Sequence, residues 1–237
     1  MKAVKCVLSV AWKVLAVLLT LVIIAGAVFM VKGYMLYSKT VKETPLAARV
    51  AELKERENYT QYGDLPQFYI DAVISVEDHR FNRHCGIDVI AIMRAAWNDI
   101  KSMSFAEGGS TITQQLAKNM YYTQEKKLER KTAEMFTAFA LERNYEKEEI
   151  FELYVNSIYF GSGYYGIYDA AMGYFGKTPS RLSYYECAML AGLPNAPSNY
   201  SPDTNPELAE QRLGQVLDRM VECGKITQSQ ASSIYAG

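Results

Sequence analysis

The sequence of 237 residues is poor in the side chains that usually build metal centres. It contains only two histidines and four cysteines, with no H-E-x-x-H motif and no C-x-x-C pair. Zinc sites take most of their ligands from such residues at close spacing, so a zinc enzyme is not indicated. The cysteine spacing leaves open one disulfide among Cys85, Cys187 and Cys223, with free thiols as the alternative.

The sequence also has almost no net charge. It carries 25 basic and 26 acidic residues, giving a formal charge of −1 and an isoelectric point near 6.2. Proteins that bind nucleic acid generally show a clear basic excess, so no nucleic-acid partner is expected. Hydrophobic residues make up 49% of the chain, which is enough for a packed core and excludes a disordered protein.

Acidic residues are missing from the first 39 positions, which carry five lysines. Within this segment, residues 14–31 (VLAVLLTLVIIAGAVFMV) form an uncharged run close to the roughly 20 residues that span a bilayer. Tyr34 and Tyr37 follow at the depth of an interfacial aromatic belt. We predict a single uncleaved transmembrane helix within residues 1–37. A cleaved signal peptide ending near Ala27 is the alternative.

The orientation follows from the charges that flank this run. Lys2, Lys5 and the amino terminus favour a cytoplasmic N-terminus, and no second span is visible in the sequence. The rest of the chain is therefore expected on the outer side of the membrane. Residues 38–63 are rich in charge and are expected to form a linker with a short helical pattern around residues 46–56. Residues 64–237 are expected to form the main domain.

Period-two alternation, the mark of β-strands, is absent beyond a few residues. Helical signals recur instead. Pro66 opens one helix, and Asp88 can cap another that presents an apolar stripe. Thr111 and Ser183 each begin a capping box. Residues 128–143, 147–156 and 206–222 also have helical periodicity. We predict a mainly α domain of many short helices.

A first candidate for chemistry is Glu77, which ends the helix that starts at Pro66. A carboxylate at a helix C-terminus faces the negative end of the macrodipole, which raises its pKa and suits a general base. A solvated helix end is the simpler explanation of this feature alone. The diglycine before Ser110 and Thr111 is a second candidate, because a capped helix start offers free N–H groups to a phosphate.

A third candidate is the basic cluster of residues 126–134. Arg130 and Lys131 lie four and three positions before Glu134, so the three side chains share one helix face. Such a face can hold a carboxylate among cations that also bind a phosphorylated substrate. A surface ladder of salt bridges is the alternative.

Five segments occur in order: 75–88 (SVEDHRFNRHCGID), 107–119 (EGGSTITQQLAKN), 130–134 (RKTAE), 145–166 (YEKEEIFELYVNSIYFGSGYYG) and 182–202 (LSYYECAMLAGLPNAPSNYSP). In their order and amino-acid sequence they closely resemble the motifs of the peptidoglycan glycosyltransferases, lysozyme-like enzymes that polymerise lipid II. The resemblance covers residues 65–222. It implies a lysozyme-like multi-helix fold and, because the chain ends soon afterwards, the monofunctional form with residues 64–237 as the glycosyltransferase domain.

The resemblance also implies roles for individual residues. Glu77 matches the catalytic base, which activates the 4-hydroxyl of the acceptor N-acetylglucosamine. That hydroxyl attacks C1 of the donor with inversion, and undecaprenyl diphosphate leaves. Glu134 matches the second essential carboxylate, beside the pyrophosphate. The positions implicated in binding substrate are Arg94, Ser110, Thr111, Gln114, Lys118, Arg130, Lys131 and Asn156.

The implied surroundings are those of a bacterial cell membrane, with one span and an extracytoplasmic catalytic domain. The expected partners are lipid II, the growing glycan strand and the bilayer, and the resemblance allows for other cell-wall synthesis proteins. No cofactor is predicted as a requirement, because the sequence has no D-x-D or D-D-x-x-D cluster. A Mg²⁺ or Mn²⁺ ion carried by the pyrophosphate with one carboxylate is the open alternative.

Two other functions are compatible with such a domain. A hydrolase that cuts the same glycan could use a single acidic glutamate, but it has no pyrophosphate to bind and so no need for the cationic helix. A non-enzymatic membrane scaffold could keep the fold. Loss of Glu77 or Glu134 would have favoured the scaffold, and both residues are present.

Overall fold

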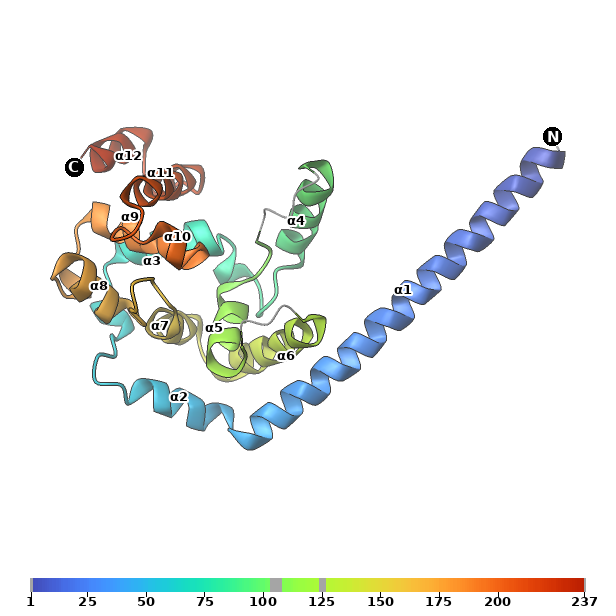
Figure 1. Ribbon diagram of the computed structural model, residues 1–237, viewed down its shortest axis with the longest axis horizontal. Helices are drawn as coiled ribbons and strands as arrows, with labels where there is room; N and C mark the ends of the chain where they lie inside the picture. Colours follow the sequence, from blue (N-terminus) through green and yellow to red (C-terminus); the bar gives the residue numbers. More distant parts are fainter. Residues whose placement is uncertain (1, 103–107, 124–126, 237) are drawn as a thin grey trace.

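The computed structural model describes residues 2–102, 108–123 and 127–236, and helices dominate that part of the chain (Figure 1). The only backbone pairing of β type there is one antiparallel bridge between Tyr159 and Tyr165. The mainly α prediction is therefore confirmed. The helices are α1 (Lys2–Glu43), α2 (Leu46–Lys54), α3 (Gln67–Glu77), α4 (Val89–Ser102), α5 (Ile112–Tyr121), α6 (Leu128–Asn144), α7 (Lys147–Ser157), α8 (Ile167–Phe175), α9 (Tyr184–Gly192), α10 (Pro197–Tyr200), α11 (Pro206–Glu222) and α12 (Gln228–Tyr235).

Local capping signals determine where several helices begin. The Thr111 and Ser183 side chains accept hydrogen bonds from the backbone N–H groups of Gln114 and Glu186, which complete the two capping boxes in return. Asp88 caps α4, because its Oδ1 accepts from the backbone N–H groups of the second and third residues that follow it. Each of these starts was expected from the sequence.

The apolar N-terminal run lies within one unbroken helix, α1, which projects away from the rest of the molecule (Figure 1). Its segment Trp12–Glu43 has a mean hydropathy of 3.0 in its most apolar window, and none of that window is buried. It is the one helix in the described part of the chain that is long and apolar enough to cross a membrane. This agrees with a single N-terminal span.

The segment 38–63 differs from the linker that its charge suggests. Helix α1 continues through Glu43, and α2 follows two residues later. Val50 and Leu53 of α2 are buried in the main core, and Tyr59 and Tyr62 pack against it. The apolar side chains of this segment recur at helical spacing, and this allows a charged sequence to bury one face. The segment is thus part of the packed domain.

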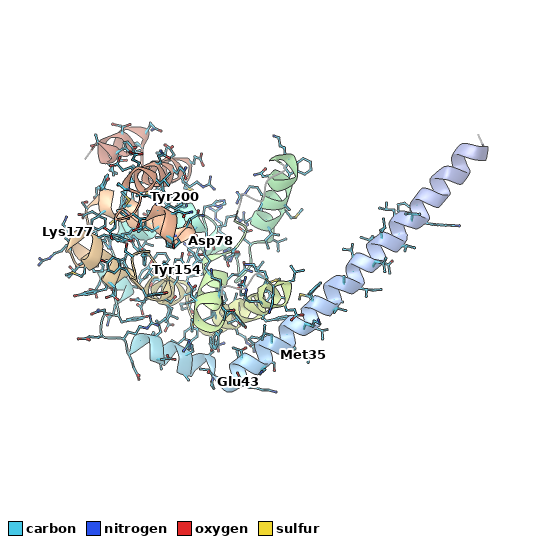
Figure 2. All side chains as sticks on the ribbon, in the orientation of Figure 1. Met35, Glu43, Asp78, Tyr154, Lys177 and Tyr200 are labelled. Carbon is cyan, nitrogen blue, oxygen red and sulfur yellow. The ribbon has the colours of Figure 1, made fainter. Side chains whose placement is uncertain are left out.

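The core lies between α3, α5, α7, α9 and α11. Helix α3 packs against α9 and α11, and α5 packs against α6 and α7. Tyr69, Phe151 and Tyr154 are among the largest fully buried side chains. This packing holds the C-terminal end of α3 near the middle of the domain, where Figure 2 places Asp78.

Helix α4 is an exception to this packing. The periodicity predicts its apolar stripe, but the stripe does not face the core: Ile90, Met93 and Trp97 are 55%, 69% and 70% exposed. In Figure 1, α4 extends from the body toward the same end as the N-terminal part of α1. An apolar helix face left uncovered is a candidate contact surface.

Candidate active site

Glu77 is the last residue of α3, and its carboxylate is removed from water. Oε2 accepts a hydrogen bond of 2.8 Å from the side-chain amide of Gln115. Oε1 is buried and has no hydrogen-bond partner among the described residues. Burial raises the pKa of Glu77, whereas the Gln115 hydrogen bond and the positive charge of Arg212 act in the opposite direction. The sequence also predicted a raised pKa for Glu77, but from the helix macrodipole, whereas the main cause in the structure is burial.

The sequence pointed to Gln114 as a site residue and did not identify its neighbour Gln115, which is the glutamine that contacts Glu77. The Gln114 side chain completes the capping box by accepting from the Thr111 backbone N–H, so it is turned away from Glu77. Gln115 lies one position further along α5. Its Oε1 accepts from the Tyr154 hydroxyl at 3.3 Å, which orients its amide N–H₂ toward Glu77. The capping box in the sequence already commits the Gln114 side chain to the helix start, and this signal could have pointed to Gln115 as the partner of Glu77.

The structure also places Glu134 among cations. Its side chain is 1% exposed, forms an ion pair with Arg130, and lies 3.2 Å from the Lys131 ammonium. The alternative of a solvated surface ladder is therefore wrong. Lys131 also donates a hydrogen bond of 2.6 Å to the Ser110 hydroxyl, which joins α6 to the segment before α5.

The cations near Glu134 are only partly hydrated. Burial and the nearby Arg130 charge lower the pKa of Lys118 on α5, while Glu77 raises it. Burial and the charges of Arg130 and Lys118 lower the pKa of Lys131 to about 8, and the adjacent Glu134 carboxylate opposes this. Cations that repel one another and have lost water favour binding of a polyanion such as a pyrophosphate.

The start of α5 is fixed from several sides. The Thr111 hydroxyl donates to the Gly86 carbonyl at 2.7 Å. The Ile112 backbone N–H donates to Asp78 Oδ2 at 3.1 Å, and the same carboxylate lies 2.9 Å from His84 Nε2. Because Asp78 directly follows Glu77, its bond to Ile112 fixes the position of the start of α5 relative to Glu77.

A cleft of about 390 Å³ opens beside Glu77. The N-terminal part of α4 contributes Arg94, whose guanidinium lies 3.4 Å from His79 Nε2. Arg212 and Arg219 come from α11, where their spacing of seven residues puts them on one face. These two arginines were not identified from the sequence. The cleft is lined by Ser75, Val76, Glu77, Asp78, His79, Asp88, Ala91, Arg94, Gly108, Gly109, Ser110, Thr111, Asn195, Arg212 and Arg219.

The structure therefore groups most of the residues that the sequence singled out. Glu77, Arg94, Ser110 and Thr111 line the cleft. Arg130, Lys131 and Glu134 lie beside it and are joined to it by the bond between Lys131 and Ser110. Lys118 is close enough to both groups for the charges of Glu77 and Arg130 to affect its pKa.

Asn156 lies apart from this group. It is 3% exposed on α7, and its amide donates to the carbonyls of Thr60 and Glu152 while its oxygen accepts from the Thr60 backbone N–H. The side chain is thus fully used in holding the segment around Thr60. This arrangement indicates a structural role, in place of the substrate contact that the resemblance implies.

Comparison with known families identifies the domain that contains this cleft. The model of the transglycosylase family matches residues 43–221, which include every residue of the cleft and of the Glu134 group. The chain belongs to the transglycosylase family. It carries a peptidoglycan glycosyltransferase domain, as the order of its motifs predicts.

Two relatives illustrate the similarity. Penicillin-binding protein 1A of Aquifex aeolicus is 47% identical over 176 residues, which cover 74% of this chain and 24% of that protein. A candidate transglycosylase of Cupriavidus necator is 38% identical over 219 residues, covering 92% of this chain and 93% of the relative. The chain thus spans about a quarter of the first relative and nearly all of the second.

Among solved structures, penicillin-binding protein 1A of Haemophilus influenzae is 24% identical. The match covers 77% of this chain and 18% of that one, with a TM-score of 0.46.

Proposed function

We propose that the protein polymerises lipid II into peptidoglycan glycan strands, with Glu77 as the general base. The observation that carries the proposal is the Glu77 carboxylate itself, which has one oxygen fixed by Gln115 and one buried oxygen without a protein partner in the described part of the chain. A raised pKa makes this carboxylate a better proton acceptor than an ordinary glutamate near neutral pH.

The proposed reaction is a direct displacement. Glu77 takes the proton from the 4-hydroxyl of the acceptor N-acetylglucosamine. The bond from that oxygen to C1 of the donor sugar forms as the bond from C1 to the phosphate oxygen breaks, so the configuration at C1 inverts. The electron pair leaves with undecaprenyl diphosphate. No covalent bond to the protein is needed, because the base and the leaving group act on opposite sides of C1.

The leaving group acquires negative charge, and the cations near Glu134 are suited to stabilise it. Lys118, Arg130 and Lys131 are partly desolvated, and a charge in such an environment interacts more strongly than in water. Glu134 holds Arg130 and Lys131 in position. Arg94, Arg212 and Arg219 line the cleft. Arg212 also donates to the Gly192 carbonyl and Arg219 pairs with Glu222, but the positive charge of the three side chains favours the anionic groups of a second lipid II molecule there.

A divalent metal would have few protein ligands here. Among the described residues, no three carboxylate, histidine or cysteine side chains are grouped to hold an ion. Glu134, the nearest candidate, already pairs with Arg130 and Lys131. If Mg²⁺ or Mn²⁺ takes part, it is carried by the pyrophosphate, and the steps above do not depend on it.

The place of the reaction follows from the lipid. The polyprenyl chain of lipid II stays in the bilayer, so the catalytic domain works at the membrane surface, on the extracytoplasmic side that the lysines before the span indicate. Helix α1 keeps the enzyme at that surface. Other cell-wall synthesis proteins would meet it there.

The test is polymerisation of labelled lipid II by the detergent-solubilised full chain. We expect long glycan from the wild type and a loss of at least about a thousandfold in Glu77→Gln, which keeps the Gln115 contact but cannot take a proton. Glu207→Gln, an exposed change in the first turn of α11, is the matched control and should leave the rate unchanged.

Three results would contradict the proposal. Glycan from Glu77→Gln at the control rate would remove Glu77 as the base. Cleavage of preformed glycan by the wild type, without synthesis, would favour the hydrolase. Binding of lipid II without either reaction would favour the scaffold.

A further inference from the structure

The last third of α1 packs against α6, the helix that carries Glu134 (Figure 1). Lys32 forms an ion pair of 2.9 Å with Glu129, and the rings of Tyr34 and Tyr37 contact the ring of Phe136. The helix that anchors the protein is therefore also a neighbour of the candidate active site.

The crossing of the two helices depends on Gly33. This glycine is buried although its neighbours on α1 are exposed. A Cβ atom at this position would overlap the hydroxyl oxygen and Cβ of Thr132 and would approach the Ala133 backbone nitrogen to 3.0 Å. The Thr132 hydroxyl lies 3.0 Å from the Phe29 carbonyl on α1. Small residues allow this kind of close approach between helix backbones in membrane proteins.

Gly26, two turns earlier on α1, provides a contrast. A Cβ atom there would meet nothing within 4 Å. The apolar run of residues 14–31 is thus free of the domain over most of its length, and contact begins near Phe29. The start of α6 consequently lies at the level where the apolar run ends.

Two faces of helix α6 make different contacts. Glu129, Thr132 and Phe136 face α1, whereas Arg130 and Glu134 form the ion pair beside the cleft. Consecutive residues advance about 1.5 Å along a helix axis. The ion pair therefore lies within about 3 Å, along α6, of the point where Thr132 meets Gly33.

We propose that the crossing of Gly33 with Thr132 sets the height and orientation of Arg130, Lys131 and Glu134 relative to the lipid surface. Gly33 is then a positioning residue for transfer from a membrane-bound donor, an assignment that rests on the proposed function. The donor's pyrophosphate lies at the bilayer surface, so a displacement of α6 by about 1 Å is enough to lower the rate up to a hundredfold.

The test compares Gly33→Val with Gly26→Val in the full chain, reconstituted in liposomes. The depth of α6 is read from a tryptophan placed at Leu128, an exposed position at the start of α6, after Trp12→Phe and Trp97→Phe remove the native tryptophans. Quenching by lipids brominated at different depths reports its position. Polymerisation of lipid II in the same liposomes reports the rate.

We expect the quenching profile of Gly26→Val to match that of the parent and the profile of Gly33→Val to shift. The rate should fall about tenfold or more in Gly33→Val only. Gly33→Ala should show a milder form of both effects. The exchange Gly33→Ala with Thr132→Gly moves the small residue from one helix to the other and should restore both the profile and most of the rate.

Three outcomes overturn the proposal: an unchanged profile and rate in Gly33→Val, equal losses in both valine variants, or an exchange variant no better than Gly33→Ala. If the profiles shift as expected but even the wild type makes no glycan, the crossing is supported and the proposed polymerase function fails. The two proposals can therefore fail separately.

Discussion

Gln114 and Gln115 are neighbours with different surroundings, and the difference decides what each can do. Gln114 completes a capping box and is buried against the start of α5. Gln115 fixes one oxygen of Glu77 and is itself oriented by Tyr154. A substitution of Gln115 should therefore alter the proton affinity of Glu77, whereas a substitution of Gln114 should alter the stability of the helix start.

The protonation of Glu77 and Lys131 predicts a bell-shaped dependence of kcat/KM on pH. Glu77 must be ionised to accept a proton, so activity is lost as pH falls through its pKa, which burial places above that of an ordinary glutamate. In the proposed mechanism Lys131 must be charged to stabilise the leaving group, so we expect activity to be lost as pH rises beyond about 8. Initial rates of polymerisation between pH 4 and about 10 measure both limbs.

Two variants test whether Glu77 controls the acid limb of the pH profile and Lys131 the alkaline limb. Gln115→Ala removes a hydrogen bond that lowers the pKa of Glu77, so the acid limb should move to higher pH. Lys131→Arg keeps the charge at every pH in this range, so the alkaline limb should move to higher pH. Limbs that stay in place in both variants would show that other groups control the profile.

At the scale of helices, local signals in the sequence were sufficient where a residue interacts with its own near neighbours. The starts of α4, α5 and α9 depend on capping side chains one to three residues away, and the face shared by Arg130, Lys131 and Glu134 follows from helical spacing. The ion pair within α6 was predicted for the same reason. These features need no knowledge of the tertiary structure.

Features that depend on packing between distant segments were not predictable in this way. Arg212 and Arg219 reach the cleft because α11 packs against α3, more than 130 positions earlier in the chain. Asn156 bonds to Thr60 because α7 lies beside the segment after α2. Residues 46–56 show a helical pattern in the sequence, and α2 confirms it, but the sequence did not show that Val50 and Leu53 of this helix are buried in the main core. One further prediction from the sequence is that the apolar residues near the diglycine, Ile100, Met103 and Phe105, dip into the outer leaflet; these three lie outside the residues whose side chains are described.

The capping box of α5 predicts a measurable contribution to stability. Thr111→Ala removes a cap and a buried hydrogen bond to Gly86, and should lower the free energy of unfolding by about 2 kcal/mol. Thr227→Ala removes the cap of the same kind from the exposed start of α12 and should cost only about 0.5 to 1 kcal/mol. Denaturant unfolding in detergent gives both values, and equal losses would contradict the role of the Gly86 contact.

At the scale of the whole molecule, α1 and α4 extend in the same general direction from the body (Figure 1). Figure 2 shows Met35 and Glu43 where α1 approaches the domain, while Lys177 lies on its opposite side. A bilayer crossed by α1 therefore lies on the side toward which α4 points. The exposed apolar face of α4 is on the element best placed to meet it.

This arrangement predicts that Trp97 contacts lipid. In Trp12→Phe, Trp97 is the sole tryptophan, and brominated lipids should quench its fluorescence in liposomes. The control adds Trp97→Phe and Met172→Trp, which puts the probe on α8, far from α1 in Figure 1, and should show little quenching by lipid. Equal accessibility of both probes to a quencher in water would contradict membrane contact by α4.

The unbroken course of α1 has one further consequence. A hydrophobic helix that is longer than the bilayer is thick can adapt by tilting. Because α1 continues without interruption into the crossing at Gly33, its tilt is passed directly to α6 and to the ion pair of Arg130 and Glu134. We therefore expect the position of the domain to depend on the thickness of the membrane that α1 crosses, and the proposed glycan synthesis to depend on lipid composition.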